Sequence, residues 1–287
     1  IPLLMLGALW AARSLNQVRG VMVVGSTLLL ALSVYLTIDY LALRQAGATA
    51  EMLYTASTVW YAPLNICYSV GVDGISVAML LLSSIIVFTG TFASWQLKPM
   101  TKEYFLWFTL LSAGVYGFFI STDLFTMFMF YEVALIPMYL LIGVWGSGQK
   151  EYAAMKLTLM LMGGSAFLLI GILGIFYGAG GDTMNLLEIA QRHIPTEMQR
   201  LFFPLIFLGF GVLGALFPFH TWSPDGHASA PTAVSMLHAG VLMKLGGYGC
   251  FRVAMYLMPE GAEIWGNFFL VLTTISVVYG AFSAVVQ

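Results

Sequence analysis

The sequence has 287 residues, of which 60% are hydrophobic and only 8% are charged, with a formal net charge of −2 at pH 7. Soluble globular domains carry about 25% charged residues, so this composition excludes an ordinary soluble domain and predicts a protein that crosses the membrane several times. The near-neutral charge gives no indication of nucleic-acid binding.

Nine apolar segments can be placed along the chain, and all but the first, which is shorter, are long enough to span a bilayer as helices. Short polar connections separate most of them, with one longer loop at 44–73. A second long connection, 178–200, contains the polar stretch NLLEIAQRHI, which we expect to lie as a helix at the membrane interface. The predicted spans are 1–12, 20–43, 74–96, 104–121, 123–145, 152–178, 201–221, 231–257 and 264–286.

The basic residues in the connections predict how the chain lies across the membrane. If successive connections alternate between the two sides, one side is richer in Lys and Arg than the other. The positive-inside rule assigns the richer side to the cytoplasm, so the chain is predicted to begin outside. The richer side carries Arg13, Arg19, Lys98, Lys102 and Lys150, and the other side carries Arg44, Arg192 and Arg200.

Glu132 lies near the middle of the apolar segment 123–145. A charged carboxylate at the centre of a bilayer costs about 2.5–3.5 kcal/mol on insertion scales. Glutamine would make nearly the same hydrogen bonds at a lower cost, so an ionisable group in this place indicates that its proton is used. We predict that Glu132 carries a proton; a protonated glutamate that only bonds a neighbouring helix is the alternative.

The seventh segment, 201–221, is rich in residues that interrupt helices. Glycines and a proline lie in the run LGFGVLGALFPFHTW, where proline removes a backbone donor and glycine relaxes the backbone. Irregular backbone inside a membrane is tolerated where it is buried in protein or lines a watered cavity, and transporters build ion sites there. We therefore predict a broken helix at 211–219; an ordinary helix that ends at Phe217 is the alternative.

The eighth segment, 231–257, carries His238 and Lys244. Lys244 is near mid-span, too far from either end to reach the headgroups easily, and we expect it to be buried. A buried lysine can exchange its proton near neutral pH, and histidine titrates there without help. Both are predicted as proton carriers, although a structural role for His238 stays open. Lys156, in the first turns of the sixth segment, is a further candidate, and its alternative is a side chain that reaches the headgroups.

No pattern typical of a bound cofactor is present. Cys67 and Cys250 have no Cys or His neighbour at metal-ligand spacing, so we expect free thiols that pack in the fold. The sequence contains no GxGxxG unit between a strand and a helix and no phosphate-binding loop. We therefore expect neither a metal nor a nucleotide, flavin or iron–sulfur cofactor in this chain.

Two longer stretches carry a resemblance to a known family. FYEVALIPMYLLIGVWG (130–146) and FPFHTWSPDGHASAPTAVSMLHAGVLMKLGGYG (217–249) resemble the antiporter-like membrane subunits of respiratory complex I. The most similar type is the M subunit, which is numbered 4 in mitochondria and lettered D in photosynthetic complexes. The resemblance extends over about 70–287 and is shared in part with sodium/proton antiporter and membrane-bound hydrogenase subunits.

The resemblance implies an all-α polytopic membrane protein with two inverted five-helix repeats, each with a broken helix. Residues 1–103 would form leading helices, 104–257 the first repeat, and 258–287 the start of a second. Because the chain starts without Met and stops inside an apolar run, we expect a piece of a longer protein.

In the family, the positions of Glu132 and Lys244 belong to the proton path, and histidines occupy the positions of His220 and His227. We predict both histidines on the same path, with His220 favoured over His238 as the base between Glu132 and Lys244. The sequence departs from the family at Leu213, where the related subunits carry a lysine that pairs with the glutamate.

These features predict a proton-translocating membrane-arm subunit of a complex I-type NAD(P)H or ferredoxin:quinone oxidoreductase, with no redox centre of its own. The expected partners are the other membrane-arm subunits and the lipid bilayer, and the expected location is a bacterial plasma membrane. Two alternatives stay open. The chain could belong to a cation/proton antiporter of the Mrp type, or it could be a structural subunit whose channel is silent because of Leu213.

Overall fold

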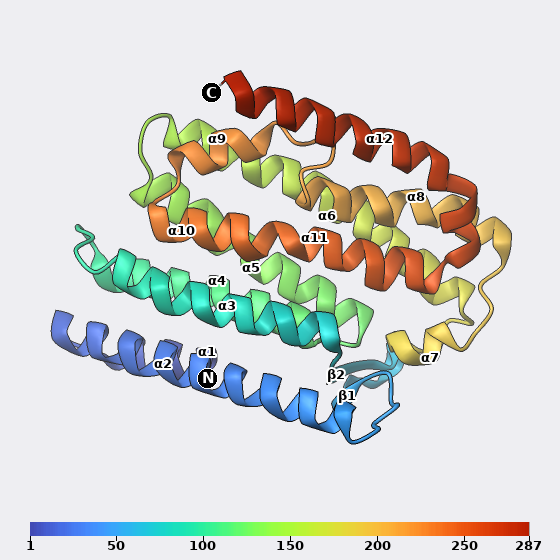
Figure 1. Cartoon of the computed structure of the whole chain (residues 1–287), viewed down its shortest axis with the longest axis horizontal. Coiled ribbons are helices and arrows are strands. Elements are labelled where there is room, and N and C mark those ends of the chain that lie inside the picture. The colour runs from blue at the N-terminus through green and yellow to red at the C-terminus, as the bar shows by residue number, and fades with distance from the viewer. Residues whose placement is uncertain (287) are drawn as a thin grey trace.

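The structure is a computed structural model that describes residues 1–286. Long helices run side by side to form a bundle, and a two-stranded sheet lies at one end of it (Figure 1). Within the described part, seven helices are long and apolar enough to cross a membrane. They are α2 (Leu15–Gln45), α3 (Gly74–Ala93), α4 (Thr101–Ile120), α5 (Leu124–Trp145), α6 (Lys150–Gly178), α8 (Thr196–Leu213) and α12 (Pro259–Val286).

The other two predicted spans have a different form. The first is the short helix α1 (Pro2–Ala11). The eighth is divided into α10 (Thr232–Leu237), the π-helical turn η2 (His238–Leu242), α11 (Met243–Gly249) and a second π-helical turn η3 (Cys250–Met255). π turns widen the backbone locally and occur frequently at functional sites. The helical polytopic fold is thus confirmed, with an eighth span less regular than predicted.

Helix α4 forms the centre of the N-terminal half. It packs against α1, α2, α3 and α5. Large apolar residues recur on it at spacings of four and three, which places them in line along a helix. All of them are fully buried, so this row holds the neighbouring helices together. The row consists of Tyr104, Phe108, Leu111, Val115 and Phe118.

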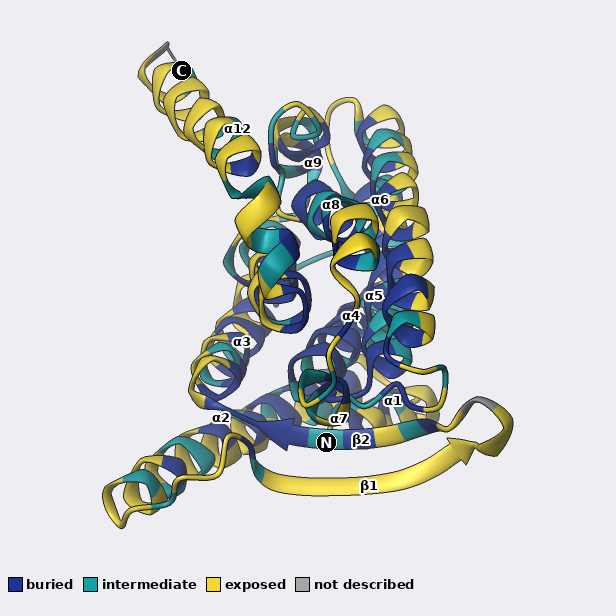
Figure 2. Ribbon diagram, turned by 90° about the vertical axis from the view of Figure 1, so that its right-hand side faces the viewer, coloured by how far each residue is buried: buried dark blue, intermediate teal, exposed yellow. Residues whose placement is uncertain are grey.

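The outer helices present apolar side chains to the surroundings. Most of α12 and much of α2 are exposed along their length (Figure 2). On α12 the exposed fractions reach 71% at Val277 and 85% at Val285. A continuous apolar surface of this kind is typical of a face that contacts lipid or another protein.

The loop predicted at 44–73 contains a β-hairpin, so the prediction of an all-helical chain was incomplete. Strand β1 (Leu53–Tyr61) pairs antiparallel with β2 (Ile66–Val72). The run LYTASTVWY is rich in aromatic and β-branched residues, which favour strands. The backbone N–H of Thr122 donates to the Ser69 carbonyl at 3.0 Å, which ties the hairpin to the end of α4.

The connection between α6 and α8 holds the short helix α7 (Leu186–Ala190). Its N-cap is Asn185, whose side-chain oxygen accepts from the backbone N–H groups of Leu187 and Glu188 at 3.0 and 3.4 Å. A helix was predicted in this polar stretch, and the structure confirms it over five residues.

The seventh span is broken, as predicted. Helix α8 ends at Leu213, four residues before the end that the alternative required. An irregular segment follows, in which Ala215 adopts a left-handed φ of +57°, and the chain re-enters a helix at α9 (Trp222–Ser229). The backbone groups released by the break find partners: the Phe217 N–H donates to Ser276 Oγ of α12 at 2.7 Å.

Candidate proton-transfer site

Glu132 lies on α5, where it faces α6. Its side chain is partly buried, and among residues 1–286 no group hydrogen-bonds its buried Oε1 atom. The hydroxyl of Ser165 on α6 lies beside the carboxyl group but donates to the Met162 carbonyl at 3.0 Å. Buried polar atoms in proteins usually have a partner, so the free oxygen marks Glu132 as a functional candidate.

His238 is the first residue of the π turn η2 and is completely buried. Within the described residues neither of its ring nitrogens has a hydrogen-bond partner. Its ring stacks on Trp222 with centroids 5.2 Å apart, and on His227 at 4.2 Å. We predicted His238 as a proton carrier or a satisfied structural histidine; its nitrogens lack the hydrogen bonds of a satisfied histidine, and its role as a carrier stays a prediction.

Two neighbours fix this stack beside the broken helix. The indole N–H of Trp222 donates to the Val212 carbonyl, in the last turn of α8, at 3.1 Å. The Nδ1 atom of His227 lies 3.0 Å from Ser235 Oγ of α10. Gly226 packs against the stack: a Cβ atom in its place would lie at ordinary contact distance, 3.5 Å, from His238 and 3.1 Å from the end of the Leu157 side chain. The stack therefore joins α8, α9 and α10.

A cavity of about 640 Å³ with a mixed polar and apolar lining opens beside α9. Lys156 of α6 and Asp225 of α9, which both line it, form an ion pair at 2.7 Å. Sequence reasoning missed Asp225 as the partner of Lys156, since 69 residues separate the two. His220 also lines the cavity; its ring lies 4.9 Å from that of Tyr279 on α12, and so it faces protein, as predicted. The lining includes Lys156, His220, Ser223, Asp225, His227, Ser276, Tyr279 and Ser283.

We expect Asp225→Asn to lower the free energy of unfolding by about 1 kcal/mol or less. The side chains of Lys156 and Asp225 are 24% and 42% exposed, so water and salt screen their attraction. Thermal unfolding at low and high salt measures the effect, with Glu151→Gln as a control on an exposed carboxylate of α6. A loss of several kcal/mol would show that the pair holds the α6–α9 contact.

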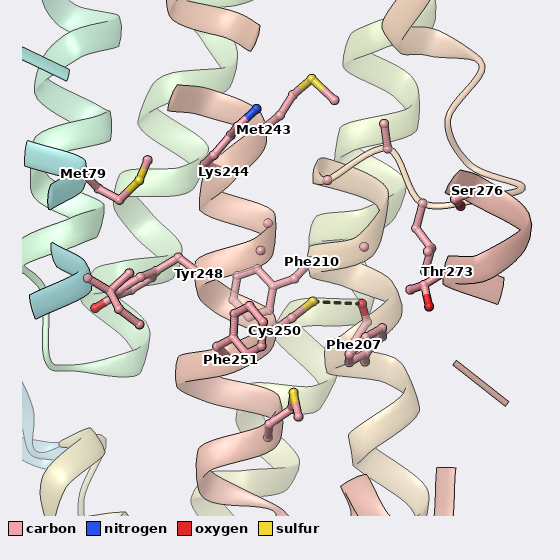
Figure 3. A pocket seen from close by; sticks show the side chains of 18 of the residues that line it. Met79, Phe207, Phe210, Met243, Lys244, Tyr248, Cys250, Phe251, Thr273 and Ser276 are labelled. Atoms are coloured by element: carbon pink, nitrogen blue, oxygen red, sulfur yellow. Dashed lines mark hydrogen bonds between the residues drawn. The ribbon is translucent and has the colours of Figure 1, made fainter. Parts of the chain in front are cut away.

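Lys244 was expected to be buried, and this expectation was wrong for the part of the chain that the structure describes. Its side chain is exposed, and its ammonium donates to the Ala239 carbonyl at 2.7 Å. The reason is its direction: Lys244 points out of α11 to the rim of a mainly apolar cavity of about 610 Å³ between α8, α11 and α12. Figure 3 shows Lys244 and Met243 at one end of this cavity, with Phe207 and Phe251 further along it.

No hydrogen bond among residues 1–286 connects Glu132 with the histidines or with Lys244. Leu157 and Leu161 of α6 are fully buried, and Leu157 lies against Gly226 of α9. Leu213, at the end of α8, is buried as well. The structure thus brings His227 and His238 together, and groups Lys156 with His220 around the cavity. Glu132 remains apart from both.

A second charged cluster, which sequence reasoning missed, lies at the opposite end of the bundle. The Arg252 guanidinium pairs with Asp73, the N-cap of α3, and with Glu51 at 3.2 Å. The Tyr256 hydroxyl donates to the other oxygen of Glu51 at 2.7 Å. These contacts join the start of the hairpin and α3 to the second π turn, η3, so they anchor the irregular eighth span.

The residues that the structure describes contain no cluster of three or more His, Cys, Asp or Glu side chains able to hold a metal ion. In the part of the chain that the structure describes, the titratable groups beside the broken helix include two close pairs, Lys156 with Asp225 and His227 with His238.

With this geometry established, comparison with known proteins assigns the family. The chain belongs to the family described as NADH:quinone oxidoreductase/Mrp antiporter, TM, whose model matches residues 121–287. The match begins just after α4 and includes α5, the broken helix and the divided eighth span. The resemblance found in the sequence is thereby confirmed, and the seven apolar helices agree with a membrane protein.

Curated relatives point to one branch of this family. NAD(P)H-quinone oxidoreductase chain 4 3 of Picosynechococcus sp. is 38% identical over 235 residues, which cover 82% of this chain and 43% of the relative. The chloroplastic NAD(P)H-quinone oxidoreductase chain 4 of Citrus sinensis is 38% identical over 226 residues, which cover 77% of this chain and 45% of the relative. The chain therefore spans less than half the length of these relatives.

Solved structures share the fold. A chain of respiratory complex I from Thermus thermophilus aligns with a TM-score of 0.87 and 24% identity, over all of this chain and 58% of that chain. A chain of the membrane-bound sulfane sulfur reductase, an archaeal respiratory membrane complex, aligns with a TM-score of 0.85 and 22% identity. That alignment covers 99% of this chain and 57% of the reductase chain. At these identities the likeness establishes the fold alone.

Proposed function

We propose that this chain is part of a proton-translocating membrane subunit of a complex I-type NAD(P)H or ferredoxin:quinone oxidoreductase. Redox chemistry elsewhere in the complex would drive changes of protonation along Glu132, the histidines and Lys244. The chain would hold no redox cofactor and no catalytic centre of its own. Its partners would be other membrane-arm subunits, and its location a bacterial plasma membrane.

One observation carries the proposal. Glu132 combines a position near the middle of a membrane-length helix with a buried carboxyl oxygen that has no partner in the described part of the chain. A structural glutamate would be expected to satisfy both oxygens, because an unpaired buried acceptor costs about 1–3 kcal/mol. Ionisable groups inside membrane segments are characteristic of proton relays. The curated relatives, which are named as quinone oxidoreductase chains, support this reading over an antiporter without a redox partner.

A silent structural subunit is the second candidate, and Leu213 favours it. The end of α8 carries a buried leucine where the related subunits have lysine, and the buried Leu157 of α6 lies against Gly226 beside the stacked histidines. Such a subunit would need Glu132 only for packing. Replacement of Glu132 by its amide distinguishes the two functions.

We expect Glu132→Gln to leave assembly intact and to lower proton transport through this chain by about 100-fold or more. The amide keeps the shape and the hydrogen-bonding capacity but cannot titrate, and a positioned proton-transfer group typically contributes a factor of about 100 or more. Proton transport by the assembled complex in vesicles measures this, with the exposed Glu103→Gln as the matched control. Wild-type transport in the Glu132 variant would favour the silent subunit.

A further inference from the structure

A group of basic side chains lies at the end of the bundle away from the hairpin, where α1 and α3 end and α2 and α4 begin (Figure 1). These side chains come from two short segments, 10–19 and 92–104, which contain one acidic residue, Glu103. Four positive charges and one negative charge give the two segments a net charge of +3. The group, called the basic end below, consists of Arg13, Arg19, Lys98 and Lys102.

Arg19 is held beside the turn between α3 and α4. Its Nη2 atom donates to the Trp95 carbonyl at 2.7 Å. Its guanidinium also lies over the Trp95 ring, with 5.0 Å between Cζ and the ring centroid. Within residues 1–286 the Nε atom has no acceptor. Lys98 follows in the same turn, so Trp95 fixes one cation close to the backbone that carries a second.

Lys102 connects the start of α4 with the end of α1. Its ammonium donates to the carbonyls of Trp10 and Ala12 at 2.9 and 2.7 Å, and Ala12 directly precedes Arg13. The start of α4 has no side-chain cap, because its N-cap residue is Met100. The first N–H groups of a helix lack partners within the helix and favour a nearby anion. This helix start therefore adds to the positive potential of the basic end.

The positive charges of the basic end have no protein counter-charge. In the part of the chain that the structure describes, none of the four cations forms an ion pair. At the opposite end, by contrast, Arg192 pairs with Asp182, and Arg252 pairs with two carboxylates. The positive-inside rule explains which side of the membrane carries the cations, but it does not require them to converge unpaired. Their convergence favours a bound anion.

Apolar side chains beside the basic end are exposed. Trp10 is 79% exposed, and Leu15 and Phe92 are exposed as well. Phe92 stacks on Trp95 with 14° between the ring planes. Tryptophan is enriched where hydrocarbon meets the headgroups of a membrane, because its ring has an apolar body and a polar N–H group. An anion bound at the basic end therefore lies next to an apolar surface, which an amphiphile can cover and a free ion cannot.

We propose that the basic end binds the headgroup of an anionic phospholipid, from the leaflet on the side predicted to be cytoplasmic. The guanidinium and ammonium groups donate to the phosphate oxygens, and the acyl chains lie against the exposed apolar side chains of α1 and α3. Basic pockets between membrane helices bind headgroups of this kind. Binding here involves neither Glu132 nor the histidines, so it stands apart from the proposed proton transport.

Lipid binding to the complete complex in a neutral detergent tests the proposal. Native mass spectrometry counts the molecules of phosphatidylglycerol or phosphatidylcholine that the complex retains as each lipid is titrated. We expect the tightest phosphatidylglycerol site to bind about 100-fold more tightly than phosphatidylcholine, because each Lys or Arg near an anionic headgroup contributes about 5-fold. Equal retention of the two lipids would overturn the proposal, and this comparison needs no variant.

Two substitutions test where the lipid binds. Arg13 and Lys98 are exposed, so Arg13→Gln and Lys98→Gln should leave the fold intact. We expect each to weaken the tightest phosphatidylglycerol site about 5-fold, and the two together about 25-fold. Arg200→Gln, which removes an exposed cation at the opposite end, is the matched control and should change nothing. Unchanged binding in the double variant, or an equal loss in the control, would place the lipid elsewhere and overturn the proposal.

A free phosphate ion offers the same charge and the same oxygen acceptors as the headgroup. Inorganic phosphate in 100-fold excess over phosphatidylglycerol separates the two sources. We expect it to displace no lipid from the wild-type complex, because the acyl chains hold the lipid on the apolar surface. Displacement of the lipid that the double variant loses would show a site for soluble anions, and the assignment to a phospholipid would fail.

Discussion

Asp73→Asn is expected to lower the free energy of unfolding by about 3–5 kcal/mol, the largest loss that we predict. The side chains of Arg252 and Asp73 are only 10% and 12% exposed, so removal of the carboxylate leaves a guanidinium buried without its main counter-charge. Asparagine can still cap α3 through the Ser76 N–H, which the Asp73 carboxylate now accepts at 2.8 Å. The substitution therefore removes the negative charge while it keeps the helix cap, so the measured loss reports on the charge alone.

Glu51→Gln is the matched control for this prediction. Glu51 pairs with the same guanidinium but is 47% exposed, so its loss should cost about 1 kcal/mol or less. Thermal or denaturant unfolding of the purified complex compares the two. Equal losses from both substitutions would mean that Asp73 does not balance a buried charge.

Gly246→Ala is expected to destabilise the protein by about 1–3 kcal/mol or more and to disturb the broken helix. A Cβ atom at Gly246 would lie 2.5 Å from the Gly214 nitrogen and 2.5 Å from the Phe210 carbonyl oxygen. Both are backbone atoms, so no side chain can move aside, and overpacking of this kind costs about 1–3 kcal/mol. The close approach of α11 to the end of α8 thus requires glycine.

The neighbouring Gly247 provides the control, because a Cβ atom there would meet nothing within 4 Å. Gly247→Ala should be neutral or stabilise the helix by roughly 0.5–1 kcal/mol. Unfolding and proton transport measured on both variants test the contact between α11 and α8. The same outcome for the two alanines would contradict it.

The main outlines of the fold follow from composition and local pattern. Runs of apolar residues locate the long helices, and the glycines and proline near Leu213 locate the break, because both effects depend on neighbouring residues alone. The hairpin was missed because its strand-like run, 53–61, lies inside a long connection between two apolar spans. The π turns depend on how the eighth span packs, so no local pattern indicated them.

The site was predictable in its residue types more than in its contacts. Glu132 and His238 stand out because polar groups are costly inside apolar segments. The Lys156–Asp225 and Arg252–Asp73 pairs join residues far apart in the chain, and only the packing of helices determines them. Lys244 is a further example. The sequence predicts its position along the eighth span, but the side of the helix from which it projects depends on how the helices pack.

The most direct test of proton translocation through this chain combines Glu132→Gln and Lys244→Ala in the complete complex. Proton release per quinone reduced is measured in vesicles for each single variant and for the double variant. If both residues serve one path, each single variant loses the part of the proton release that passes through this chain. The double variant then loses no more than either single variant, because effects on a common path are not additive. Unchanged proton release in all three variants would contradict the account.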